Sequence, residues 1–218
     1  MEFVIPTMWR NPSFTLDALE YYLSIEKITK IILIDNDFKR RPNSEILNSK
    51  KIKILNYGRN IYVNEAWNRG MENASDDLVC ICNDDIRVDK LAISLVLEFE
   101  SLNSCDLIGV NNDVKATCFG ICRFKVDLKK NLGLQAGGVF GLAMFIRKNN
   151  YKKIPQDLKV WFGDDYLVRN CKNVFTISPI KFSGGMSTTI SSMRKEGGHI
   201  DEVIQRDVYN WNKNNKYI

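Results

Sequence analysis

Short apolar runs alternate with amphipathic segments along the first half of the chain. The runs at 3–5, 30–35, 52–55 and 78–82 each predict a strand. Between and after them, apolar residues recur three or four positions apart over 12–23, 63–70 and 91–102, which predicts three helices. Continuous apolar strands separated by such helices are typical of a parallel sheet that is covered on both faces.

The second half of the chain follows this pattern less regularly. Strands are predicted at 107–110 and at 137–146, where two glycines lead the apolar run. Residues 160–167 predict a turn that opens a short helix, and another helix is predicted from Asp201 to about Trp211. A mobile loop is predicted over 183–199, which is rich in serine, threonine and glycine, and 111–136 predict a connecting excursion. Neither a repeat nor a linker is evident, so we expect one domain over 1–218.

Polar residues follow most of the predicted strands directly. In parallel α/β sheets, ligands bind beyond the carboxyl ends of the strands, so these residues are the candidates for binding. This arrangement is typical of nucleotide binding. The residues in question are Thr7, Arg10, Asp35, Asp37, Asn56, Asp84 and Asp85.

An acidic pair, Asp84-Asp85, follows Asn83 at the end of the fourth predicted strand. Successive side chains diverge, so one carboxylate could bind Mg²⁺ or Mn²⁺, which take oxygen ligands and bridge phosphates, while the other binds ribose hydroxyls. The alternative is that the pair caps the following helix. The position after the fourth strand favours a binding role.

A second acidic pair, Asp164-Asp165, begins the predicted short helix after Gly163. A carboxylate there could act as a general base toward a hydroxyl group. Amides at a helix N-terminus favour the ionised form, so we expect at least one of the two acids to be charged at neutral pH. Taken alone, the pair is more simply a helix cap.

Two further features gain meaning only in combination with the acidic pairs. Gly137-Gly138 could bring the backbone close to a ligand, although a turn is the simpler interpretation. His199, the only histidine, follows two glycines in the predicted loop and could move onto a metal ion.

Composition favours a small anionic ligand over nucleic acid. The 218 residues include 31 Lys+Arg and 26 Asp+Glu, a net charge of +5, which suits a nucleotide diphosphate. The only dense basic cluster, Lys39-Arg40-Arg41, predicts a solvated turn and not a nucleic-acid surface. No secretory signal and no run of about 20 apolar residues is evident, which predicts a cytoplasmic protein without a membrane span.

The six cysteines are predicted to be reduced and mostly buried. Cys80 and Cys82 alternate within an apolar strand, so both side chains should point to one buried face. Cys118 and Cys122 are four residues apart, but no second Cys/His pair stands at zinc-site spacing.

The segment after the first strand disfavours a Rossmann dehydrogenase. Pro6-Thr7-Met8-Trp9-Arg10 stands where a Rossmann dehydrogenase carries Gly-x-Gly-x-x-Gly. Neither a P-loop nor a Ser-His-Asp signature is present. The candidate chemistry therefore rests on the acidic pairs.

Taken together, these residues resemble the GT-A glycosyltransferases, especially the large inverting family 2, over roughly residues 2–170. The order of the later motifs makes the match specific. Asn83 departs from the family, because it replaces the first carboxylate of Asp-x-Asp, and the gap between the two Asn-x-Gly units is longer than usual. The matching segments are Phe3-Val4-Ile5-Pro6-Thr7, Ile34-Asp35-Asn36, Asn56-x-Gly58, Asn68-x-Gly70, Asn83-Asp84-Asp85, Gly137-Gly138, Asp164-Asp165 and His199.

The resemblance implies a single GT-A domain with a mostly parallel central sheet flanked by helices. It implies transfer of a hexose or deoxyhexose from a nucleotide-diphosphate sugar, a UDP-sugar above all, to a glycan, glycoprotein or other hydroxyl acceptor, with inversion. Residues to about 105 would then bind the donor, and 106–218 would bind the acceptor and carry the catalytic residues. The implied donor contacts are Pro6, Thr7, Arg10, Asp35, Asn64, Asn83, Asp84, Gly137 and Gly138.

The resemblance also assigns the remaining roles. Asp85 and His199 would hold Mn²⁺ or Mg²⁺ against the diphosphate. Asp165, with Asp164 in reserve, would deprotonate the acceptor hydroxyl. Apart from the resemblance, Trp161 could either pack on the face of an acceptor sugar or belong to the core.

Two other functions stay open for the same fold. One is a sugar nucleotidyltransferase, which usually carries a glycine-rich, basic loop after the first strand. The other is a non-catalytic domain that binds nucleotides or glycans. The compact size is also similar to glycosyltransferase domains encoded by large DNA viruses, which would imply the host cytoplasm.

Overall fold

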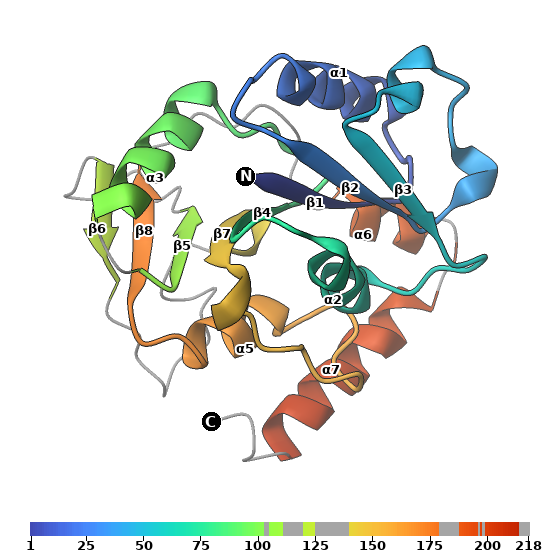
Figure 1. Cartoon of the computed structure of the whole chain (residues 1–218). Helices are drawn as coiled ribbons and strands as arrows, with labels where there is room; N and C mark the ends of the chain where they lie inside the picture. The colour runs from blue at the N-terminus through green and yellow to red at the C-terminus, as the bar shows by residue number, and fades with distance from the viewer. Residues whose placement is uncertain are drawn as a thin grey trace.

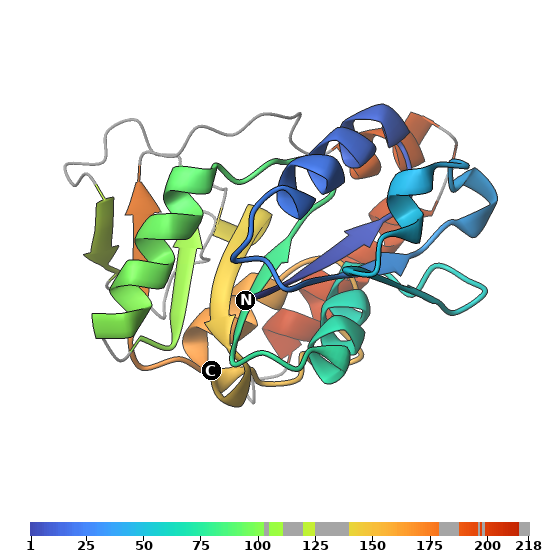
Figure 2. The same cartoon turned by 45° about the horizontal axis from the view of Figure 1, so that its top comes forward.

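The computed structural model describes residues 1–102, 105–110, 120–124, 140–178, 188–195, 197 and 199–213. Eight strands form one sheet in the order β3-β2-β1-β4-β7-β5-β8-β6, with helices on both of its faces (Figures 1 and 2). The strands are β1 (Glu2–Thr7), β2 (Lys30–Asp35), β3 (Ile52–Asn56), β4 (Leu78–Cys82), β5 (Leu107–Val110), β6 (Gly120–Arg123), β7 (Ala143–Arg147) and β8 (Val174–Ser178).

Most of this sheet is parallel, as the sequence predicts. Strands β1 to β4 are parallel to one another, and β5 and β8 run in the same direction, whereas β7 and β6 run against their neighbours. The long helices are α1 (Pro12–Leu23), α2 (Val63–Asn73), α3 (Lys90–Leu102), α5 (Gly163–Arg169), α6 (Thr188–Lys195) and α7 (Ile200–Lys213). The expected α/β fold class is therefore confirmed.

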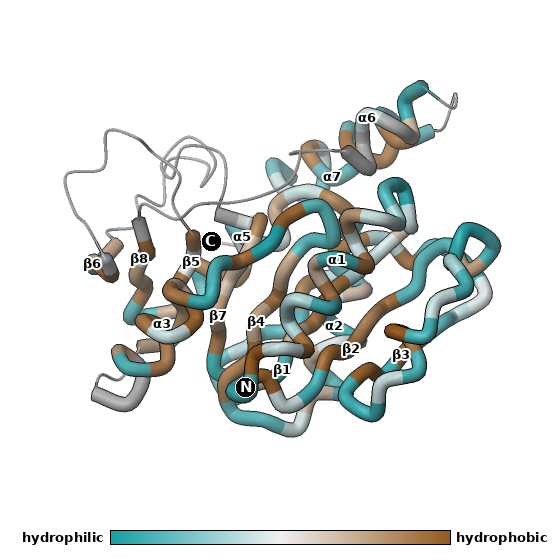
Figure 3. The backbone as a smooth tube through the Cα atoms, turned by 90° about the horizontal axis from the view of Figure 1, so that it is seen from above, coloured by the Kyte–Doolittle hydropathy of each residue, from teal (hydrophilic) through white to brown (hydrophobic). Residues whose placement is uncertain are grey.

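Two hydrophobic cores lie on opposite faces of the sheet because strand side chains alternate. Phe3 and Ile5 of β1 pack with α1 and α3, whereas Val4 packs with α2, α5 and α7. Cys80 and Cys82 share the first face, as predicted. In Figure 3, hydrophobic residues follow the central strands and hydrophilic residues follow the peripheral loops.

Close packing between α2 and β1 depends on one glycine. A Cβ atom on Gly70 would lie 2.1 Å from Cγ1 of Val4, a distance that real structures do not show. The helix can therefore approach the strand only because this position lacks a side chain.

Several elements differ from the sequence prediction. The predicted loop over 183–199 is wrong at 188–195, which form α6, and strands β6 and β8 were not expected. Serine and threonine lower helix propensity only slightly, and α6 is stabilised by its packing on α7 and by the ion pair between Arg194 and Asp201 at 2.6 Å. The predicted strand at 137–146 begins only at Ala143, after a 3-10 turn at Phe140–Leu142.

Cysteine pairing corrects one expectation. Cys80, Cys82, Cys105 and Cys171 are free thiols, as predicted. Cys122 is disulfide-bonded, so the prediction of a reduced thiol is wrong there. No described helix combines the length and apolar character that a membrane crossing requires.

Candidate functional site

The ends of β1, β2 and β4 bring three of the expected residues into one hydrogen-bond chain. These strands are parallel neighbours, so their carboxyl ends meet at one edge of the sheet. Thr7 Oγ1 donates to Asp84 Oδ2 at 2.5 Å and accepts from the backbone N–H of Trp9 at 3.0 Å. The indole Nε1 of Trp9 in turn donates to Asp35 Oδ1 at 3.0 Å. The edge is thus cross-linked by polar contacts before any ligand binds.

Trp9 is a site residue that the sequence analysis passed over. Its side chain is 2% exposed, and its backbone φ of 55° lies in the left-handed region that bulky residues rarely adopt. Such a conformation persists only where the surroundings enforce it, here through the bonds to Thr7 and Asp35. A bulky aromatic residue within the expected binding loop was the only sequence signal.

Asp35 is fully buried, and four donors occupy its carboxylate. Oδ1 accepts from Trp9 Nε1 and from the backbone N–H of Asp37 at 3.1 Å, and Oδ2 accepts from Arg41 Nε at 2.6 Å and Nη2 at 2.5 Å. A carboxylate offers about four acceptor positions, so these contacts saturate it. Lys39, Arg40 and Arg41 are exposed at a 3-10 turn, as predicted, but Arg41 also pairs with the buried Asp35 beside the edge.

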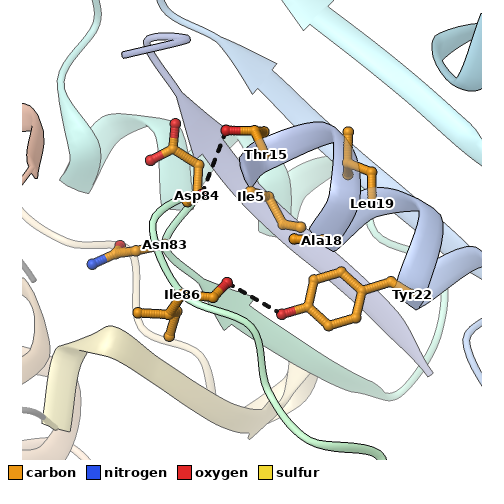
Figure 4. Close-up of a pocket in the computed structure, with 8 residues that line it drawn as sticks. All are labelled: Ile5, Thr15, Ala18, Leu19, Tyr22, Asn83, Asp84 and Ile86. Carbon is orange, nitrogen blue, oxygen red and sulfur yellow. Dashed lines mark hydrogen bonds between the residues drawn. The ribbon is translucent and has the colours of Figure 1, made fainter. Parts of the chain in front are cut away.

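Asp84 accepts from Thr7 and from the backbone N–H groups of Met8 and of its own residue, yet its pKa is raised. Burial raises its pKa to about 6, the hydrogen bond from Thr7 acts in the opposite direction, and the neighbouring charge of Asp85 raises it further. Figure 4 shows the Asp84 carboxylate turned away from the apolar side chains of α1, while its backbone carbonyl accepts from the Thr15 hydroxyl at 3.5 Å. The apolar side chains of α1 therefore support the loop, and the Asp84 carboxylate points away from them.

Tyr22 on α1 anchors the loop that carries this acidic pair. Its hydroxyl accepts from the backbone N–H of Val88 at 2.9 Å and donates to the carbonyl of Ile86 at 3.5 Å (Figure 4). Burial raises the pKa of Tyr22 well above its ordinary value, so the hydroxyl remains protonated. Helix α1 thus holds the loop that carries Asp84 and Asp85 in place.

The turn at Phe140–Leu142 joins the two acidic pairs. The carbonyl of Leu142 accepts from the backbone N–H of Asn83 at 3.0 Å. On the other side of the turn, a Cβ atom on Gly141 would lie 2.8 Å from Asp164 Oδ2, and the Gly141 N–H donates to that carboxylate. Both acidic pairs therefore lie at the same edge of the sheet. The sequence did not single out Gly141. The glycines that it did single out, Gly137-Gly138, lie outside the described residues.

The environment of Asp164 opposes its ionisation. Burial and the adjacent Asp165 charge raise its pKa, and these effects outweigh the backbone N–H groups at the helix start and on Gly141. The helix amides therefore do not decide the charge of Asp164, and the expectation that at least one acid of the pair is charged stays a prediction. Asp165 is 6% exposed, whereas Asp164 is half-buried.

Asn64 places the segment that precedes the second acidic pair. Its side-chain amide donates to the carbonyls of Leu158 at 3.2 Å and Trp161 at 3.1 Å. A Cβ atom on Gly163 would lie 2.1 Å from its Oδ1, so the start of α5 packs directly on this residue. The structure thus gives Asn64 a role between α2 and α5, and its expected contact with a donor stays a prediction.

The other expected residues lie in varied settings. Pro6 is a buried strand residue paired with Ile34, and Arg10 is half-buried just beyond β1. Trp161 is 43% exposed. His199 is exposed, with Nδ1 3.1 Å from Glu202 Oε1.

No metal cluster is preformed in the part of the chain that the structure describes. There, no three histidine, cysteine or acidic side chains are grouped so as to hold an ion. The expected ligation of a metal by Asp85 and His199 therefore stays a prediction.

Comparison with solved structures identifies the fold. Residues 1–349 of TarS from S. aureus align with a TM-score of 0.60 and 13% identity, covering 88% of this chain and 63% of that one. The complex of the same TarS residues with UDP-GlcNAc aligns with a TM-score of 0.59 and 11% identity, covering 86% of this chain and 60% of that one. HddC from Yersinia pseudotuberculosis aligns with a TM-score of 0.57 and 15% identity, covering 89% of this chain and 98% of that one.

These likenesses establish a GT-A-like fold, and identities this low establish the fold alone. The chain spans less than two thirds of the TarS 1–349 structures it matches. No protein-family model and no curated protein sequence matches the chain.

The raised pKa of Asp164 predicts how stability depends on pH. The folded protein holds this proton more tightly than the unfolded chain, so the stabilisation is lost as pH rises through the folded pKa. Asp164→Asn mimics the protonated form. We expect its melting temperature to match that of the wild type only below the ordinary Asp pKa of 3.8, and to exceed it by an increasing margin as pH rises to 8. Equal pH dependence of the two proteins in thermal denaturation would contradict the burial of this charge.

The close approach of Gly141 predicts a local effect of Gly141→Ala. The new methyl group would push against the end of a flexible side chain, so the fold should survive while the Asp164 carboxyl group moves. We therefore expect an Asp164 pKa closer to the ordinary value, measured by carboxyl ¹³C NMR. Gly197→Ala is the control: this glycine is exposed, no atom lies within 4 Å of the new Cβ, and the strain at its φ of 71° is local, so the Asp164 pKa should not change.

Proposed function

We propose that this chain is a glycosyltransferase that moves a sugar from a nucleotide-diphosphate sugar to a hydroxyl acceptor. The proposal rests chiefly on the two acidic pairs, Asp84-Asp85 and Asp164-Asp165, which the turn at Phe140–Leu142 joins at one edge of the sheet. Solved TarS structures of the same fold contain UDP or UDP-GlcNAc, which favours a UDP-sugar as the donor.

The donor side of the proposed site is organised before binding. Thr7, Trp9 and Asp35 form a connected network, so little side-chain ordering is needed when a nucleotide binds. The charge of Arg41 is balanced by Asp35, but its guanidinium has five N–H groups, and those that do not face Asp35 could donate to an anionic ligand. Asp84 turns its carboxylate outward and can accept from ribose hydroxyls.

The acidic pair at the end of β4 fits a divalent cation, although no cation is part of the structure. Carboxylate oxygens are the ligands that Mg²⁺ and Mn²⁺ prefer, and Mg²⁺ is commonly held by one or two carboxylates together with substrate phosphates. The mutual repulsion of Asp84 and Asp85 is what a bound cation would relieve. When bound, such an ion stabilises negative charge on the leaving diphosphate. In this proposal Asp85 is the principal ligand, and His199 joins it only by moving with its loop.

The second acidic pair supplies the base. An acid whose pKa is raised toward neutral pH can accept a proton from a hydroxyl group and release it again. Sequence resemblance favours Asp165 in this role. Asp164 has the stronger structural claim, because its carboxyl group faces the turn that leads to Asn83 while Asp165 is buried. A base on the acceptor side fits direct displacement with inversion, and exposed Trp161 is the candidate acceptor platform.

A sugar nucleotidyltransferase is the main alternative. It needs a flexible loop after β1 that can wrap a triphosphate. Here the buried indole of Trp9 fills that loop and is bonded to Asp35, which counts against the alternative. A non-catalytic domain would bind the same nucleotide without turnover.

Nucleotide-sugar turnover tests the proposal. With UDP-sugars and Mn²⁺, we expect release of UDP that increases when a hydroxyl acceptor is supplied. A donor at 100 times its Kd should stabilise the fold by about 2.7 kcal/mol, which raises the melting temperature by roughly 5–10 °C. Asp85→Asn should abolish the metal-dependent part of the reaction and keep the fold. Binding without release of UDP would instead indicate the non-catalytic alternative, and pyrophosphate release from UTP the nucleotidyltransferase.

Substitution of each acid in the second pair identifies the base. Removing a positioned base costs typically 10²–10⁴-fold in rate. If Asp164 is the base, as its position favours, Asp164→Asn shows the larger loss of transfer rate. If Asp165 is the base, as the family resemblance favours, Asp165→Asn does. Donor binding should be unchanged in both variants. Anomeric couplings measured by NMR should show inversion in the product. Retention of configuration would remove the base role from both acids.

A further inference from the structure

Helix α7 holds the backbone that leads into the second acidic pair. Asp207 on this helix is 1% exposed, and its carboxylate accepts three consecutive backbone N–H groups. Oδ1 accepts from Lys159 at 2.9 Å, and Oδ2 accepts from Val160 at 2.6 Å and Trp161 at 2.9 Å. Figures 1 and 2 show α7 alongside α5, on the face of the sheet that α2 also covers.

A second contact from the same helix holds the residue next to α5. The ring of Phe162 stacks on Trp211 with centroids 4.9 Å apart and an interplanar angle of 6°. The Phe162 backbone has a φ of 62°, a left-handed conformation that needs support in a bulky residue. Arg169 lies over the other ring of the pair, 4.8 Å from the Trp211 centroid. Helix α7 therefore restrains the backbone as far as Phe162, the residue before α5.

The segment 158–161 is bound from two sides with opposite chemistry. Asp207 accepts its N–H groups, while Asn64 on α2 donates to its carbonyl groups at Leu158 and Trp161. Buried backbone groups need such partners, so the segment has one favoured position. Gly163 and Asp164 follow within three residues, and their position depends on where this segment ends.

We propose that Asp207 is a positioning residue for the acceptor side of the site. Through the backbone at 159–161, it fixes the start of α5 and with it Asp164, Asp165 and the exposed Trp161. It does not belong to the donor side, which is built on the separate network from Thr7 to Arg41. The inference rests on the proposed function for its catalytic consequence, and on the contacts of α7 for its structural part.

The chain offers a matched control for this residue. Asp106, just before β5, also binds two backbone N–H groups, those of Lys172 at 2.7 Å and Asn173 at 2.8 Å, and accepts from Asn150 Nδ2 at 2.8 Å. It precedes a strand that runs parallel to β8 and in the direction of β4, so it lies at the edge opposite the acidic pairs. Asp106→Asn therefore removes a similar carboxylate clamp away from the site.

The test compares Asp207→Asn with Asp106→Asn in three measurements. For Asp207→Asn we expect faster hydrogen exchange at 159–161, an Asp164 pKa displaced toward its ordinary value in carboxyl ¹³C NMR, and unchanged UDP affinity. Transfer to the acceptor should fall by about 10²-fold, as expected for a displaced catalytic group. Asp106→Asn should leave the Asp164 pKa, UDP affinity and transfer unchanged.

The outcomes separate this inference from the proposed function. An Asp207→Asn protein whose Asp164 pKa is the same as in the wild type overturns the positioning role, whatever the activity. A wild-type protein that transfers no sugar overturns the proposed function, while a displaced Asp164 pKa in the variant would still support the structural role. If Asp207→Asn does not fold, Trp211→Leu keeps the carboxylate but removes the stack on Phe162, and should shift the same pKa in the same direction.

Discussion

Carboxylates that are buried near the carboxyl edge of the sheet need hydrogen-bond donors. The loops and helices around this edge supply them. A charge taken out of water is costly unless hydrogen bonds replace its hydration. Asp35 receives four donors and Asp207 receives three consecutive backbone N–H groups. These saturated acids tie loops from distant parts of the chain to one place, so they act as structural anchors.

Asp84 and Asp164 also accept hydrogen bonds, but these do not offset the effects of burial and of a neighbouring acid. Each lies beside a second carboxylate, and burial raises the pKa of each above its ordinary range. Clusters of this kind reduce stability when they ionise, and perturbed acids gather at functional sites because catalytic groups need a pKa matched to their task. The presence of a second carboxylate therefore distinguishes Asp84 and Asp164 from the acids that serve as anchors.

Helices from both faces of the sheet support the same edge. Tyr22 on α1 anchors the loop with the first acidic pair, and Asn64 on α2 and Asp207 on α7 anchor the backbone before the second. Because both hydrophobic cores are continuous with these helices, the loops are fixed by rigid elements. A site built this way holds its groups in place before a ligand arrives.

The local sequence was sufficient to predict β1 to β5, the first three helices and both acidic pairs as candidates, because hydrophobic periodicity and adjacent carboxylates are properties of neighbouring residues. Only tertiary structure decided which groups meet. Arg41 was predicted to lie in a solvated turn, and no local sequence signal marked Gly141 or Asp207. Each acquires its role from a partner elsewhere in the fold: Asp35, Asp164 and the backbone at 159–161. Strand β8 and helix α6 likewise form where β5 and α7 provide pairing and packing, because a weak local preference is outweighed by contacts that exist only once the chain has folded.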